Sequence, residues 1–124
     1  MRIHVGDRKN RMAGMHSKRM NPALLEMVAE RFKALSDRAR LSLLQELRDG
    51  PHTVNELVEA TGMGQANVSR HLSQLFAAAL VTREREGVYV RYQLADQDVL
   101  KLCELVCGRI EDELTERKRL VAGR

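Results

Sequence analysis

The spacing of apolar residues predicts two helices in the first half of the chain. An Asn21-Pro22 pair suits the start of the first helix, because Asn caps well and Pro is tolerated in the first turn. The apolar face of this helix is Leu24, Leu25, Val28, Phe32 and Leu35. Ser36 and Asp37 break it and cap a second helix, which ends at residues 49–51, Asp-Gly-Pro. The apolar stripe of the second helix is Leu41, Leu44 and Leu47.

Two shorter helices are expected next, joined by a tight turn. Thr53 and Glu56 form a capping-box pattern, in which each side chain bonds the backbone N–H of the other, so a helix should run to about residue 60. Residues 61–64, Thr-Gly-Met-Gly, form the turn, and another helix follows over 65–78. This arrangement predicts a helix-turn-helix unit.

Beyond residue 80 the pattern changes from helical to alternating. Two β-rich runs, 81–85 and 88–94, flank Glu86-Gly87 and predict a hairpin. A last helix begins at Asp96 and Asp98, and its apolar side is Val99, Leu102, Cys103, Val106, Ile110 and Leu114. The expected fold is mainly α with a small β-hairpin (α+β): a winged helix-turn-helix of about five helices and a two-stranded wing.

Length and charge refine this organisation. The 124 residues suffice for one domain, expected over residues 21–115, after a basic and disordered arm at 1–20 and before a charged, frayed tail at 116–124. The net charge of +4 suits a polyanionic partner, although a solubility margin is the alternative. No apolar run is long enough to span a bilayer and none resembles a secretory signal, so a cytoplasmic protein without a membrane partner is expected.

The second helix of a helix-turn-helix unit enters the major groove of DNA. Over 65–78, Val68, Leu72 and Leu75 share the side expected to face the core, and the opposite side is polar, without Glu or Lys. Asn and Gln can pair with adenine and Arg with guanine, so double-stranded DNA is the expected partner. The predicted DNA-binding residues are Gln65, Asn67, Ser69, Arg70, His71, Ser73, Gln74, Arg85 and Arg91.

Alternatives remain for some of these residues. His71 flanks the apolar side, so it either packs under the helix or contacts DNA. In the wing, Arg83 joins Arg85 and Arg91 as a candidate for phosphate or minor-groove contacts, but Glu84 and Glu86 weaken that case and favour a merely solvated hairpin.

Four stretches together resemble the ArsR/SmtB family of bacterial repressors. They are Leu-Ser-Asp-Arg-Ala-Arg-Leu at 35–41, Val-Asn-Glu-Leu at 54–57, Gly-Gln-Ala-Asn-Val-Ser-Arg-His-Leu at 64–72 and Gly-Val-Tyr-Val-Arg-Tyr at 87–92. The resemblance implies a homodimer through the first and last helices, a near-palindromic operator, and release of DNA when a ligand binds.

The known sensor sites of that family are not present here. Thr53 and Asn55 stand where arsenic and cadmium/lead sensors carry a Cys-x-Cys pair. Arg109 and Asp112 stand where zinc and cobalt sensors have the later His ligands, and Gln45 replaces a cysteine of the persulfide sensors. The resemblance therefore implies a repressor without naming its effector.

Two cysteines are the remaining candidates for a sensor. Cys103 and Cys107 lie one helical turn apart, so both thiols can reach one soft ion or metalloid such as arsenite, zinc or cadmium. A further ligand would come from His4, His16 or the other subunit. The alternative is that both cysteines pack as small apolar residues.

Other classes of function have less support. No nucleophile–base pair, phosphate-binding glycine loop or paired carboxylates emerge, so the chain is not expected to be an enzyme. The alternative to an operator-binding repressor is a winged-helix protein-interaction module, since this fold also docks protein partners.

Overall fold

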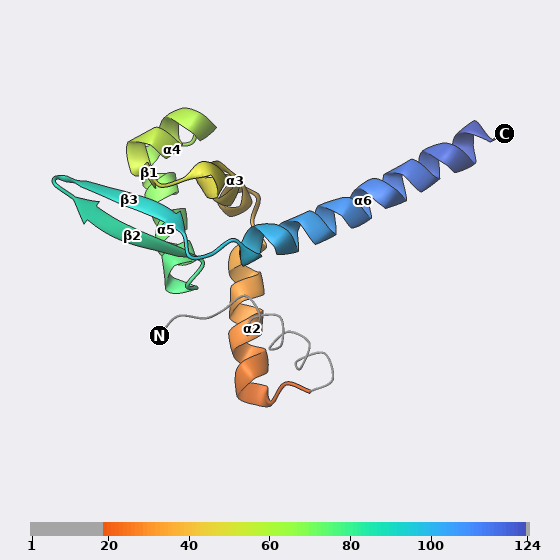
Figure 1. Ribbon diagram of the computed structural model, residues 1–124, viewed down its shortest axis with the longest axis horizontal. Coiled ribbons are helices and arrows are strands. Elements are labelled where there is room, and N and C mark those ends of the chain that lie inside the picture. The colour runs from red at the N-terminus through yellow and green to blue at the C-terminus, as the bar shows by residue number, and fades with distance from the viewer. Residues whose placement is uncertain (1–18, 124) are drawn as a thin grey trace. The chain divides into compact units, whose positions relative to one another are not determined.

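The computed structural model describes residues 19–123 (Figure 1). The helices are α2 (Pro22–Leu35), α3 (Arg38–Glu46), α4 (Val54–Thr61), α5 (Gln65–Ala77) and α6 (Asp98–Ala122), with a short 3₁₀ turn, η1 (Leu47–Asp49), after α3. The strands are β1 (His52–Thr53), β2 (Val81–Glu86) and β3 (Tyr89–Leu94). By its internal contacts the chain divides into residues 1–30 and residues 31–124. The arm predicted at 1–20 lies outside the described residues, apart from Arg19 and Met20.

The predicted fold class is confirmed, with two corrections. The wing is a sheet of three strands in the order β1-β3-β2, because His52 and Thr53 pair with Tyr92 and Arg91. Two residues are too few to show an alternating pattern, so β1 was not expected from the sequence. The expectation of a frayed end over 116–124 is wrong for residues 116–122, which continue α6 to Ala122. Helix-forming residues fill this segment, and the side chains of Glu116 and Arg119 form an ion pair at 3.4 Å.

Capping fixes where the helices of the helix-turn-helix begin and end. The Thr53 hydroxyl accepts from the Glu56 N–H at 3.2 Å, and the Glu56 carboxylate accepts from the Thr53 N–H at 2.8 Å, which confirms the predicted capping box. Gly62 ends α4 in the left-handed conformation, with φ of 76°. Asp37 caps α3 by accepting from the Arg40 N–H at 3.0 Å.

One core joins these elements and holds α5. Val68, Leu72 and Leu75 of α5 are fully buried, as predicted. They pack in a cluster with α3, η1, α4, the sheet and the start of α6, whose other buried members are Leu43, Leu44, Leu47, Leu57, Val81, Tyr92, Leu94, Val99 and Leu100. Because apolar area buried on one side of a helix stabilises only that rotation, the opposite side of α5 must face outward.

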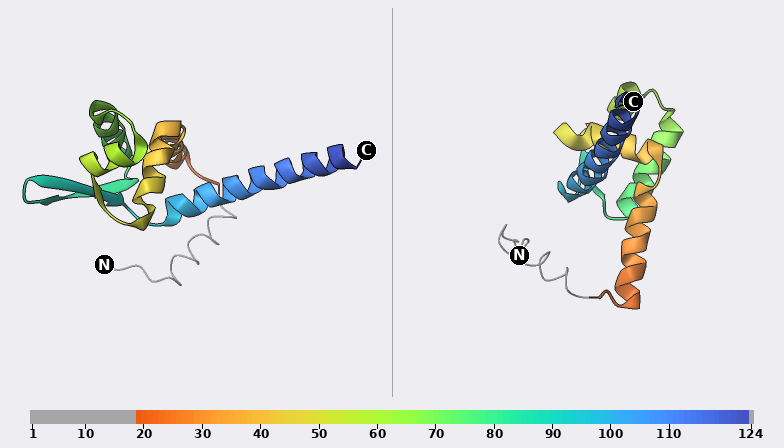
Figure 2. Two further views of the ribbon diagram at one scale, coloured as in Figure 1. Left: turned by 90° about the horizontal axis from the view of Figure 1, so that it is seen from above. Right: turned by 90° about the vertical axis from the view of Figure 1, so that its right-hand side faces the viewer.

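The apolar stripe of α6, by contrast, is largely uncovered after its first turns. Val106, Ile110 and Leu114 are each about half exposed, although all three lie on its predicted apolar side. Figure 2 shows α6 as one unbroken helix. Phe32 of α2 is also half exposed. None of the helices within residues 19–123 is long and apolar enough to cross a membrane.

Candidate nucleic-acid interface

The outward face of α5 carries hydrogen-bonding side chains. Its exposed predicted residues are Gln65, Asn67, Ser69, Arg70 and Ser73. Gln74 is exposed as well, but its side-chain oxygen accepts from Arg40 Nη1 at 2.6 Å, on the side of α5 that carries His71. Ala66 and Ala77 are also exposed on this helix, and such small side chains allow close approach of a ligand to the backbone. The outward face of α5 therefore offers hydrogen-bond donors and acceptors and is open enough for a large ligand to approach the helix.

Arg70 is held in place by a neighbour on the same helix. One terminal nitrogen of its guanidinium donates to the Asn67 side-chain oxygen at 2.9 Å. This leaves other N–H groups of the guanidinium, and the amide nitrogen of Asn67, available to an external acceptor. An arginine that is oriented beforehand loses less side-chain entropy when it binds.

His71 lies on the inner side of the same helix. It is only 7% exposed, and its Nδ1 lies 3.3 Å from Arg40 Nη1 and 3.9 Å from Asp37 Oδ2. Of the two alternatives that the sequence left open for His71, the structure favours packing beneath the helix. The pKa of Asp37 is lowered, mainly by the hydrogen bond from the Arg40 backbone and further by the charge of the Arg40 guanidinium.

The two faces of the wing carry different charge. Arg83 and Arg85 pair with Tyr92 and Val90 across the hairpin, so these four side chains share one face, where they line a hollow of about 390 Å³. The Arg83 guanidinium lies 4.0 Å from the centre of the Phe76 ring of α5. This stacking fixes Arg83 beside the end of α5 while leaving its charge on the surface.

Arg91 belongs to the other face and is paired with acids. Its guanidinium donates to Glu86 at 2.7 Å and lies 3.4 Å from Glu56. The Glu86 carboxylate raises the pKa of Arg91, with a further contribution from the charge of Glu56. The alternation that predicted the hairpin also puts Arg91 on the opposite face from Arg83 and Arg85, although the three arginines were expected to act together.

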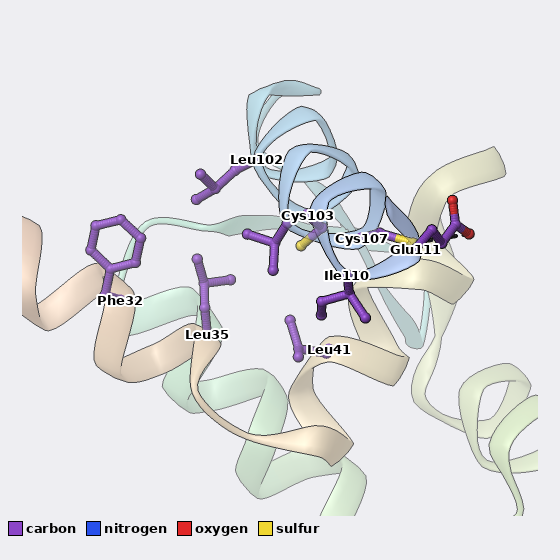
Figure 3. Close-up of a pocket in the computed structure, with 9 residues that line it drawn as sticks. Phe32, Leu35, Leu41, Leu102, Cys103, Cys107, Ile110 and Glu111 are labelled. Carbon is purple, nitrogen blue, oxygen red and sulfur yellow. Dashed lines mark hydrogen bonds between the residues drawn. The ribbon is translucent and has the colours of Figure 1, made fainter. Parts of the chain in front are cut away.

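Cys103 and Cys107 line one apolar cavity of about 380 Å³ (Figure 3). The rest of its lining comes from the end of α2, the start of α3 and α6: Phe32, Leu35, Leu41, Leu102, Val106, Ile110 and Glu111. Cys107 Sγ lies 3.7 Å from Glu111 Oε2. The charge of Glu111 is the largest cause of a raised pKa for the Cys107 thiol, with burial next. His4 and His16 lie outside the described residues, and within those residues no three His, Cys, Asp or Glu side chains gather as a metal site.

Comparison with known proteins shows which family this chain belongs to. Residues 37–83 match the family described as bacterial regulatory protein, arsR family. The arsenical resistance operon repressor of Bacillus subtilis is 38% identical over 87 residues, which cover 68% of this chain and 83% of that protein. The chain belongs to the ArsR family.

A solved structure of a related protein shares the fold of this chain. It is the homodimeric winged helix-turn-helix DNA-binding domain of a possible ArsR-family regulator from Mycobacterium bovis. The match has a TM-score of 0.70 and 33% identity, and it covers 81% of this chain and 94% of that one.

The curated relatives of this chain also include longer proteins. The transcriptional regulator Rv0324 of Mycobacterium tuberculosis is 38% identical over 105 residues, which cover 85% of this chain but 46% of that protein. The chain therefore spans about half the length of the first curated relatives it matches. The family match at 37–83 contains all of α5 and ends at Arg83, so the cysteines of α6 lie outside it.

The Cys107 environment gives a direct test on this ArsR-family chain. In a Cys103→Ser background, Glu111→Gln should speed alkylation of Cys107 by iodoacetamide at neutral pH, because removing the carboxylate charge lowers the thiol pKa and increases the thiolate fraction. The rate of mass increase measures the effect. Glu116→Gln, about one and a half turns nearer the end of α6, is the matched control. Equal rates in both variants would contradict the assigned cause of the shift.

Proposed function

We propose that this chain is a homodimeric, sequence-specific DNA-binding transcriptional repressor that acts in the cytoplasm. The observation that carries the proposal is the outward face of α5, which presents amide, hydroxyl and guanidinium groups while its opposite face is fixed in the core. Relatives named as transcriptional repressors support it, as does the homodimeric DNA-binding domain with the same fold. The same relatives favour a regulator over an enzyme.

In this proposal α5 lies in the major groove and reads base edges. Arg70 is the leading candidate for a guanine, because its planar fork can donate to both acceptors of that base. Asn67 and Gln65 are suited to adenine, and Ser69 and Ser73 can bond either bases or phosphates. His71 is not included, because it is buried against Arg40.

The wing contributes through one face only. Arg83 and Arg85 are exposed and make no ion pair with any residue in the part of the chain that the structure describes, so both charges are available to phosphates. Arg91 already shares Glu86 and Glu56, and moving it to DNA would leave those carboxylates near the phosphate backbone. We therefore assign the DNA contact of the wing to Arg83 and Arg85 rather than to Arg91.

We infer that a second copy of the chain covers the half-exposed apolar stripe of α6, together with the exposed side of α2. Val106, Ile110 and Leu114 recur at helical spacing along one side, as in helices that pack against a partner. A symmetric pair would present two copies of α5 and therefore favour a near-palindromic operator.

The effector is proposed to act at the cavity that contains Cys103 and Cys107. Both cysteines line the same cavity. Relatives are named for resistance to mercury and to arsenicals, and both of these agents are thiophilic. Two thiols do not complete a coordination shell, so the remaining ligand would come from the second subunit or from outside residues 19–123.

The first experiment separates an operator-binding repressor from a protein-docking module. Duplexes are selected by the protein from a random library, and the affinity for a selected duplex is measured by fluorescence anisotropy over a range of salt concentrations. We expect affinity to fall steeply with salt, and Arg85→Ala to reduce the salt slope by about one charge while Arg91→Ala leaves it nearly unchanged. Arg70→Ala should cost about 1–3 kcal/mol on the selected duplex.

The Arg85 and Arg91 variants control for each other, because each removes one positive charge from the same hairpin. An equal loss in both would contradict the assignment of DNA contact to one face of the wing. Failure of the wild-type protein to select any duplex would contradict the repressor and favour the docking module.

Dimer formation is tested by placing a charge on the proposed interface. Ile110→Glu should convert dimers to monomers in sedimentation velocity, because a carboxylate buried between two apolar helices would lack a partner. Leu105→Glu is the matched control, since Leu105 is more exposed than Ile110 and lies off the apolar stripe. Dissociation by both substitutions, or by neither, would exclude this side of α6 as the interface.

The cysteine site is tested by release of DNA. Arsenite and Cd²⁺ should each be added to the reduced protein–duplex complex, and at least one should lower its anisotropy. Cys103→Ser together with Cys107→Ser should abolish that response without changing the affinity for DNA. A response that survives in the double variant would disprove the thiol site.

A further inference from the structure

Arg40, in the first turn of α3, connects the end of α2 to α3. Its Nε donates to the Ala34 carbonyl at 2.6 Å, and its Nη2 donates to the Lys33 carbonyl at 3.3 Å. Carbonyls in the last turn of a helix lack the i+4 backbone partner of interior carbonyls, and a cation suits this negative end. The Lys33 carbonyl also accepts from the Ser36 N–H at 3.1 Å. Arg40 therefore acts as a side-chain cap for α2 while its own backbone belongs to α3.

The other edge of the same guanidinium reaches α5. Nη1 donates to the Gln74 side-chain oxygen at 2.6 Å and lies 3.3 Å from His71 Nδ1. Gln74 and His71 are one turn apart on α5, so a single planar group contacts this helix at two points. Asp37, which caps α3 through the Arg40 N–H, lies 3.9 Å from the same His71 nitrogen.

We propose that Arg40 is a positioning residue that sets the orientation of α5 relative to the end of α2, and thereby the fit of the outer face of α5 to DNA. The proposal rests on the proposed DNA-binding function. The physical basis is that hydrogen bonds are directional and apolar contacts are not. The leucines under α5 resist its separation from the core but tolerate small rotations of the helix. Hydrogen bonds from the planar guanidinium instead fix the angle between α5 and the end of α2. Base readout by several side chains requires such a fixed frame.

The same contacts join α5 to a helix that carries part of the proposed dimer surface. Lys33 and Ala34 lie in the last turn of α2, next to Leu35, which lines the cavity with the two cysteines. A displacement of the end of α2 must therefore stretch the bonds at Ala34 and Lys33 or pull on Gln74 and His71. Arg40 is the part of the described chain through which such a displacement would reach α5 by hydrogen bonds.

The test compares specific with non-specific binding. Arg40→Lys keeps the charge but loses the planar fork, and Arg40→Met loses both. Arg48→Met is the matched control, because Arg48 is exposed on η1 and its removal changes the net charge equally. Each protein, corrected for its active fraction, is titrated with the selected duplex and with a scrambled duplex at several salt concentrations.

We expect both Arg40 variants to lower the ratio of specific to non-specific affinity by about tenfold, with an unchanged salt slope, while Arg48→Met leaves the ratio unchanged. Gln74→Ala should lower the ratio less in the Arg40→Met background than in the wild type, because part of its effect depends on Arg40. An unchanged ratio in the Arg40 variants would overturn the proposal. So would an equal loss on both duplexes with a salt slope reduced by about one, which would identify Arg40 as a phosphate contact.

A measurement without DNA separates this proposal from the proposed function. In ¹H–¹⁵N spectra, Arg40→Met should shift the backbone amides of α5 and of residues 33–36 more than Arg48→Met does. If the wild-type protein selects no duplex, the repressor function is wrong and these amides alone decide the role of Arg40. Amides of α5 that do not move would overturn the proposal in either case.

Discussion

Val68, Leu72 and Leu75 have no exposed surface, and their burial decides how α5 is rotated about its own axis. A helix with one side fixed in a core can offer only its other side to a partner. Placing these residues beneath α5 therefore places Asn67, Arg70 and their neighbours on the outside. Each of the buried side chains contributes on the order of 2 kcal/mol by leaving water, so rotation of α5 by half a turn is excluded.

Burial determines the approximate orientation of α5, and hydrogen bonds then fix that orientation more narrowly. Apart from Tyr92, the buried core cluster is made of Leu and Val side chains, which pack closely but have few directional contacts. Arg40 supplies direction between α2, α3 and α5, and Phe76 holds Arg83 against the end of α5. On the wing, alternation along the strands separates free positive charge from neutralised charge, so two arginines close together in sequence have different surroundings.

The features that could be predicted from sequence were those with a local cause. The capping box at Thr53, the turn at Gly62 and the buried side of α5 depend on residues within one or two helical turns of each other. The features that escaped prediction depend on distant partners or on short segments. Arg40 meets Gln74 across 34 positions, and β1 is two residues long. The fate of His71 depended on the same distant arginine, so the sequence alone left it undecided.

The Glu56 side chain takes part in two separate structural contacts. A single carboxylate oxygen accepts from the Thr53 N–H at the start of α4, and lies 3.4 Å from both His52 Nδ1 and Arg91 Nη1 of β3. Helix initiation and attachment of the wing thus share one atom. A substitution of Glu56 therefore removes the cap of α4 and the ion pair with the wing at the same time. Over evolutionary time, positions 56 and 91 should therefore change together rather than singly.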